Sequence, residues 1–142
     1  MTTHIATIAL LLLLLGGPLS AAGQEVVAVV SARSPVTALN ADQVADIFLG
    51  KSTRFPNGSQ AVPIDQNEES ELRDRFYALY AGKSPAQVKA HWAKIIFTGR
   101  GQPPRQVGTS AEAKKAVAEN PYAIAYIEQR LVDETVRVVP RR

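Results

Sequence analysis

A polar loop between a short apolar segment and an amphipathic one carries the side chains best suited to chemistry. Residues 62–64 read as a strand bounded by turn residues, and a helical pattern follows the loop at Leu72, Phe76, Leu79 and Tyr80. The first backbone N–H groups of such a helix have no partner within it, and they lie past the carboxyl end of the strand. Small anions bind at such places, so the loop predicts an anion site.

The side chains of this loop provide several hydrogen-bond donors. Gln66, Asn67 and the hydroxyl of Ser70, with the amides beside it, are the candidate ligands. Arg100 and Arg105 lie in an irregular segment whose two glycines allow close approach of backbone, and they could supply positive charge. Each has a simpler interpretation as well. Asn67 or Ser70 can cap the helix, and the two arginines can be solvated residues of a surface loop.

The same loop carries carboxylates that oppose an anion. Glu68, Glu69 and Glu71 are favoured by the positive end of the helix dipole and would repel an incoming negative charge. Together with Asp65 they could also be imagined as oxygen ligands of calcium or magnesium. Because acids are favoured at a helix start without any metal, we predict no metal and no cofactor.

Residues for enzyme catalysis are scarce. The chain has no cysteine and two histidines, His4 and His91, of which the first lies in the predicted targeting segment. A serine–histidine or metal–histidine centre therefore has one candidate histidine at most. His91 is expected at the surface of a helix whose Trp92 packs into the core. We predict that the protein is not an enzyme.

Charge and aromatic content exclude one class of partner. The formal net charge is +3 with a pI near 9.4, acidic and basic residues are interleaved, and aromatic residues make up 6% of the chain. A nucleic-acid-binding surface needs basic residues gathered on one face with aromatics between them. Nucleic acid is therefore not a predicted partner.

The first 22 residues have the pattern of an export signal. An apolar run of eleven residues, 5–15, is shorter than the roughly 20 needed to span a bilayer, and small residues precede a predicted cleavage after Ala22. No basic residue precedes the run, so an uncleaved anchor is the alternative. Cleavage would leave a periplasmic domain, residues 23–142, that is not an integral membrane protein.

The remaining pattern alternates strands with helices. Asn40, Ser84 and Thr109 are predicted helix caps, the last two within capping boxes. Predicted strands cover residues 25–31, 62–64, 123–127 and 136–139. This alternation predicts an α/β fold, a single three-layer domain with a mostly parallel or mixed sheet.

Three segments in this order resemble the phosphate-type solute-binding proteins of ABC importers. They are residues 39–51, residues 62–64 with the loop and helix that follow, and residues 120–127. The resemblance implies one lobe of a type 2 periplasmic-binding-protein fold, export, no enzymatic activity, and phosphate held at a helix start. The family sequence at that start is Arg-Ser-Asp-Gly-Ser-Gly-Thr.

The site sequence departs from that family pattern at several positions. Ser70 matches the family serine, and Gln66 stands at the arginine. Glu69 and Glu71 replace the two glycines, and Leu72 replaces the threonine. Two carboxylates at that place predict weak binding of phosphate or another small anion, with an ABC permease or an envelope protein as a further partner. The alternative is a protein-interaction module of the cell envelope that keeps the fold and has lost the ligand.

Overall fold

The strands form one mixed sheet of five strands in the order β3-β2-β4-β1-β5. The computed structural model describes residues 25–140, so the predicted export signal lies outside the described residues. β2 is parallel to β3 and β4, and β1 is antiparallel to β4 and β5. The strands are β1 (Val26–Ser31), β2 (Val62–Gln66), β3 (Arg105–Val107), β4 (Ala123–Glu128) and β5 (Val136–Val139).

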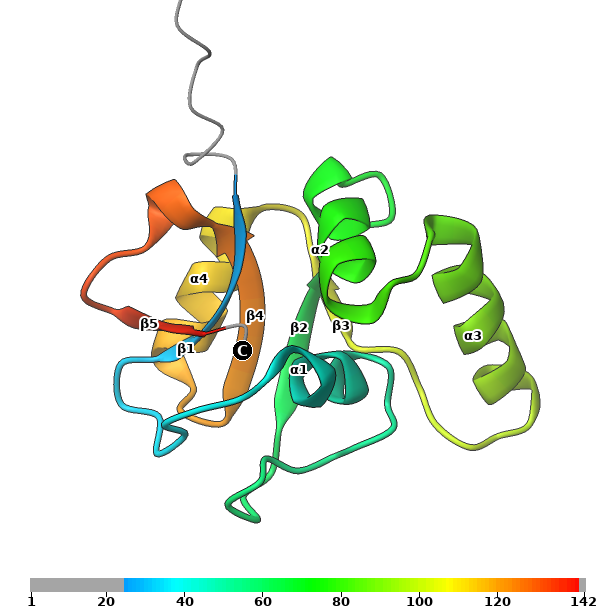
Figure 1. The fold of residues 1–142 in the computed structure, drawn as a ribbon, viewed down its shortest axis with the longest axis horizontal. Helices are drawn as coiled ribbons and strands as arrows, with labels where there is room; N and C mark the ends of the chain where they lie inside the picture. The colour runs from blue at the N-terminus through cyan, green and yellow to red at the C-terminus, as the bar shows by residue number, and fades with distance from the viewer. Residues whose placement is uncertain (1–24, 141–142) are drawn as a thin grey trace, which may run out of the picture.

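Helices cover both faces of this sheet, as Figure 1 shows. One face carries α1 (Ala41–Phe48) and α2 (Glu71–Ala81), with α3 (Pro85–Phe97) beside them at the margin. The other face carries α4 (Ser110–Glu119), and a short 3₁₀ turn, η2 (Gln129–Leu131), follows β4. The predicted single α/β domain with three layers is therefore confirmed.

Alternation along the central strands feeds two separate hydrophobic cores. In β4, Ile124 and Tyr126 enter the core beneath α1 and α2, whereas Ala125 and Ile127 enter the core beneath α4. Successive strand residues point to opposite faces, so a sheet covered on both sides needs a continuous apolar run.

None of the helices within residues 25–140 is long and apolar enough to cross a membrane.

The predicted helix starts agree with the structure. Asn40 and Ser84 cap α1 and α3 through complete capping boxes, and Ser70 caps α2. Thr109 caps α4 through its side chain. In a complete capping box, the carboxylate of Glu112 would accept from the backbone N–H of Thr109; here it accepts from the N–H of the preceding residue, Gly108, at 3.2 Å.

Three features differ from the sequence-based expectation. The segment expected to be irregular up to Arg105 ends in the edge strand β3, which is too short to give a periodic signal. Leu79, which helical spacing aligns with the buried Leu72 and Phe76, is 43% exposed. Ile96, which the same spacing aligns with the buried Val88 and Trp92, is 54% exposed. Each lies at the margin of its helix's buried stripe, where helical spacing alone cannot decide burial.

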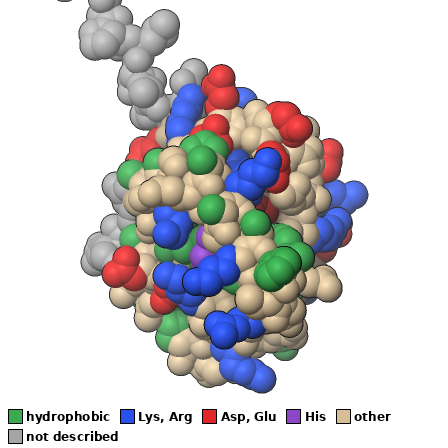
Figure 2. All heavy atoms as spheres, turned by 90° about the vertical axis from the view of Figure 1, so that its right-hand side faces the viewer, with side chains coloured by type: hydrophobic (Ala, Val, Ile, Leu, Met, Phe, Trp, Pro, Cys, Tyr) green, Lys and Arg blue, Asp and Glu red, His purple; other side chains and the backbone are tan. Residues whose placement is uncertain are grey.

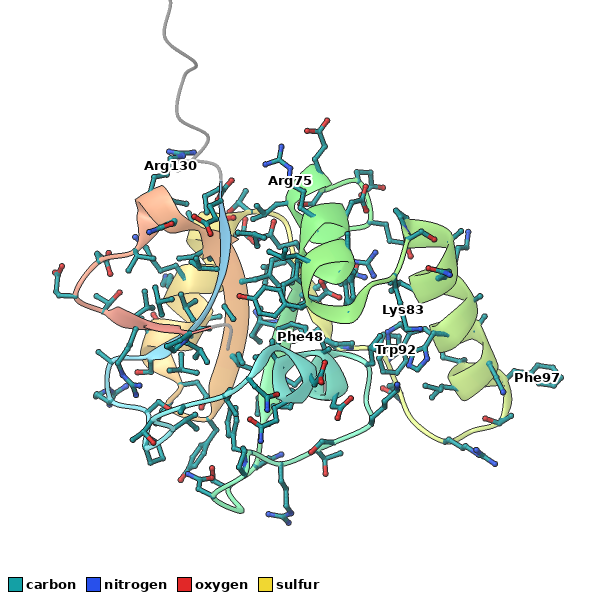
Figure 3. All side chains as sticks on the ribbon, viewed as in Figure 1. Phe48, Arg75, Lys83, Trp92, Phe97 and Arg130 are labelled. Atoms are coloured by element: carbon teal, nitrogen blue, oxygen red, sulfur yellow. The ribbon has the colours of Figure 1, made fainter. Side chains whose placement is uncertain are left out.

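Trp92 lies in the core as predicted, and its contact with Gly50 can be tested by substitution. Its ring points from α3 toward the rest of the domain in Figure 3, and it packs over Gly50. A Cβ at Gly50 would lie 2.7 Å from Cη2 of Trp92, and the backbone there has φ +71°.

We expect Gly50→Ala to lower the free energy of unfolding by about 2–3 kcal/mol, because it adds a clash to a left-handed backbone. Gly58→Ala is the matched control, since Gly58 has φ +86° and open space around it. It is expected to cost about 1 kcal/mol, from backbone strain alone. Urea unfolding compares the two. Equal losses would show that the Trp92 contact does not constrain this position.

Candidate functional site

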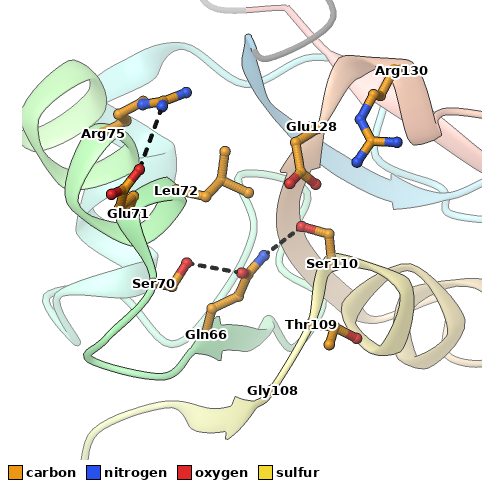
Figure 4. Close-up of a pocket in the computed structure, with 10 residues that line it drawn as sticks. All are labelled: Gln66, Ser70, Glu71, Leu72, Arg75, Gly108, Thr109, Ser110, Glu128 and Arg130. Atoms are coloured by element: carbon orange, nitrogen blue, oxygen red, sulfur yellow. Dashed lines mark hydrogen bonds and ion pairs between the residues drawn. The ribbon is translucent and has the colours of Figure 1, made fainter.

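A hollow of about 460 Å³ opens at the carboxyl ends of the parallel strands β2, β3 and β4. Figure 4 shows its lining, which is mostly polar and comes from both sides of the sheet. The lining residues are Gln66, Ser70, Glu71, Leu72, Arg75, Gly108, Thr109, Ser110, Glu128 and Arg130. Carboxyl ends of parallel strands are the usual place for a ligand in an α/β sheet.

Two helix N-termini meet at this hollow. α2 begins after Ser70 and contributes Glu71 and Leu72, while α4 begins after Thr109 and contributes Ser110. Both helices follow strands that run in the same direction, so their first turns lie at the same edge of the sheet. The positive ends of two helix dipoles thus face one space, an arrangement that favours a small anion.

Gln66 joins the two helix starts. Its Nε2 donates to Oγ of Ser110 at 2.9 Å and to the carbonyl of Tyr126 at 3.1 Å. Its Oε1 accepts from the hydroxyl of Ser70 at 3.1 Å. The side chain is buried at the floor of the hollow, and its polar atoms are engaged with protein. A ligand can reach it only by replacing some of these bonds.

Ser70 serves the helix as well as the floor of the hollow. Its Oγ accepts from the backbone N–H of Arg73 at 3.2 Å, which is the capping bond of α2, and it donates to Gln66. The hydroxyl of Ser110 accepts from Gln66, so its own proton can point elsewhere. The hydroxyl of Ser110 is therefore the side-chain donor best placed to meet a ligand. The first backbone amides of both helices can donate beside it.

The charged residues around the hollow balance each other in number. Glu71 and Arg75 form an exposed ion pair at 3.9 Å on one side, and Glu128 and Arg130 lie on the other. One carboxylate oxygen of Glu128 is buried with no hydrogen-bond partner. Two acids and two bases leave the lining without net formal charge, which predicts weak attraction for an anion.

A buried network beneath the hollow holds β2 against α2 and β4. The carboxylate of Asp65 is 1% exposed. It accepts hydrogen bonds from the hydroxyl of Tyr77 at 2.6 Å and from the hydroxyl of Tyr126. The backbone N–H of Gln66 donates to it at 2.8 Å. Nε of Arg73 lies 3.4 Å from the same carboxylate. Burial, and then the charge of Asp65, raise the pKa of both tyrosines far above the usual value. The network fixes the position of Gln66 from below.

The predicted ligand residues fall into two groups. Gln66 and Ser70 line the hollow, and Asn67 is exposed and lies beside Gly108. Arg100 and Arg105 do not line it. Arg105 lines a separate groove with α4, and Arg100 lies in the turn after α3. Of the three loop glutamates Glu68, Glu69 and Glu71, only Glu71 lines the hollow.

Several lining residues were missed by sequence reasoning. Thr109 was recognised only as the start of a helix, and neither Glu128, the last residue of β4, nor Arg130 was singled out. The signal that could have found them is topological. If the strands before α2 and α4 are parallel neighbours, both helix starts must share one edge of the sheet. Among residues 25–140, no group of three or more His, Cys, Asp or Glu side chains could hold a metal ion.

The fold is similar to that of solved substrate-binding proteins. A phosphate ABC transporter substrate-binding protein from Clostridium perfringens, with bound phosphate, has 22% identity and a TM-score of 0.66 over 82% of this chain and 44% of that chain. An ABC-type phosphate transport receptor from Vibrio cholerae has 20% identity and a TM-score of 0.64, over 82% and 45%. PstS from Borrelia burgdorferi has 12% identity and a TM-score of 0.61, over 82% and 47%.

These similarities establish the fold of the chain. It has the architecture of one lobe of a phosphate-type substrate-binding protein, and it spans less than half the length of each of these neighbours. The predicted resemblance is therefore confirmed at the level of the fold. No protein-family model and no curated protein matches the sequence.

Proposed function

We propose that this chain is an exported, non-enzymatic solute-binding protein that binds phosphate or another small anion weakly in the hollow between the starts of α2 and α4. The observation that carries this proposal is the convergence of two helix N-termini on one polar space at the carboxyl ends of β2 and β3. The similarity to a substrate-binding protein with bound phosphate supports it. An ABC permease is the corresponding partner, and the periplasm the corresponding location.

The proposed ligand contacts are the backbone amides at the two helix starts and the hydroxyl of Ser110, with Gln66 and Ser70 beneath them. Asn67 lies beside this set. Because the lining is polar, it favours a solute over the apolar contact that a protein-interaction module would need. The alternative function is therefore not favoured.

We expect Glu71→Gln to tighten phosphate binding by about three- to tenfold, because it removes a repelling charge from the lining of the hollow. Glu69→Gln is the matched control, since Glu69 is an exposed acid that does not line the hollow. Calorimetric titration with phosphate measures both variants and the wild type. An equal effect of the two substitutions would indicate general charge attraction, and no heat for any protein at millimolar phosphate would refute the proposed site.

A further inference from the structure

One part of the chain departs from the interleaved charge of the whole. Residues 75–111 contain six of the sixteen basic residues and none of the thirteen acidic ones. The remainder of the chain is therefore acidic on balance. The segment runs from α2 through α3 and β3 to the start of α4, and three of its basic residues, Lys89, Lys94 and Arg100, lie on α3 and in the turn that follows it.

Figure 2 shows this side of the molecule. Lys and Arg side chains gather over its middle and lower part, hydrophobic side chains lie between them, and acidic side chains stand mostly toward the margins. Lys89 and Lys94 project from α3, and Arg100 follows in the next turn; all three are exposed. Within the described part of the chain, none of these three is in an ion pair. Their charge is available to a partner.

The end of α3 carries the most exposed large hydrophobic residue among those described. Phe97 is 92% exposed, and Ile96 beside it is 54% exposed. Figure 3 shows the ring of Phe97 pointing away from the domain. Gly99, with φ +67°, turns the chain sharply directly afterwards, so the two side chains stand at a projecting tip. Large apolar side chains exposed beside basic ones are typical of helices that lie at a lipid interface.

We propose that the tip formed by Lys94, Ile96, Phe97 and Arg100, with Lys89 farther along the same helix, binds the surface of a membrane that contains anionic lipid. The cations meet the headgroups, and Phe97 and Ile96 enter the boundary between headgroups and acyl chains. The proposal concerns a different face from the hollow and does not depend on anion binding there.

The shape of the tip favours a membrane over an acidic protein. Two apolar side chains on a convex helix end cannot form the core of a stable protein interface, which buries about 1,000 Å² or more. A lipid interface deforms around such a projection and needs no complementary pocket. Residues 85–100 carry three basic side chains and no acidic one, which is complementary to a uniformly anionic surface, whereas a protein partner would require a matching arrangement of acids.

Flotation with lipid vesicles tests this proposal. The protein is produced from Gly23, the first residue of the predicted mature chain, so that the apolar run of residues 5–15 is absent, and circular dichroism confirms its fold. We expect binding to vesicles of phosphatidylcholine with phosphatidylglycerol, loss of binding at high salt, and little binding to phosphatidylcholine alone.

Paired variants separate the tip from general surface effects. Phe97→Ala is expected to weaken binding about tenfold, and Tyr122→Ala, which removes an aromatic ring 48% exposed elsewhere, to leave it unchanged. Lys94→Glu is expected to weaken binding at least about tenfold, and Lys115→Glu on α4 far less. No binding to anionic vesicles at low salt would overturn the proposal, and an acidic protein would then be the partner that fits the charge of this face. Equal effects within each pair would overturn it as well.

Discussion

Replacing Asp65 with alanine is expected to lower the free energy of unfolding by about 3–5 kcal/mol, a large part of the stability of a domain of this size. The carboxylate accepts hydrogen bonds from Tyr77 and Tyr126 and neutralises Arg73, all of which are buried. Without it, a buried cation loses its partner and two phenol hydroxyls lose their acceptor. Urea unfolding followed by circular dichroism measures the loss.

The control for this substitution is a carboxylate at the surface. Asp133 pairs with Lys114 at 2.8 Å, but both side chains are partly exposed. Because solvent screens that pair, Asp133→Ala is expected to change stability far less than Asp65→Ala. Similar losses for the two variants would mean that the Asp65 network does not hold β2, α2 and β4 together.

Raising the pH above about 10 is expected to destabilise the domain steeply. Burial and the neighbouring Asp65 carboxylate raise the pKa of Tyr77 and Tyr126, so the folded state keeps both protons at a pH where the unfolded chain loses them. The unfolded state then binds two fewer protons, and the free energy of unfolding falls by about 2.7 kcal/mol per pH unit. Below the ordinary tyrosine pKa, both states are protonated and these groups contribute no pH dependence.

Urea unfolding at a series of pH values from 8 upward measures this slope. Tyr77→Phe removes one of the two groups and is expected to reduce their contribution to the slope by about half. Tyr122→Phe, at an exposed position, is expected to leave the slope as in the wild type. An unchanged slope in Tyr77→Phe would contradict the assignment of the alkaline transition to the buried tyrosines.

The sequence predicted the elements of the fold well where their signals are local. The caps Asn40, Ser84 and Thr109 act on backbone groups within three residues of themselves, so their patterns could be recognised directly. For α2, the sequence left Asn67 and Ser70 as alternatives, and Ser70 is the cap. β3 was missed because its three residues pair only with β2, and that pairing is set by the tertiary fold.

The candidate site was predicted only in part because half of it comes from another βα unit. Gln66 and Ser70 belong to the loop in which the helix start was recognised, and both line the hollow. Ser110 and Glu128 come to the same place through the parallel order of β2, β3 and β4, which no local pattern specifies. The bond from Gln66 to Ser110 spans 44 residues of sequence for the same reason.

Backbone amides at the two helix starts are the central element of the proposed site, and nuclear magnetic resonance observes them directly. In ¹H–¹⁵N spectra of the labelled protein titrated with phosphate, we predict saturable shifts for the amides of residues 71–73 and 110–112, with a midpoint in the millimolar range and a tighter midpoint in Glu71→Gln. Shifts confined to other residues, such as those around Arg100, or no saturable shift at all, would contradict anion binding in this hollow.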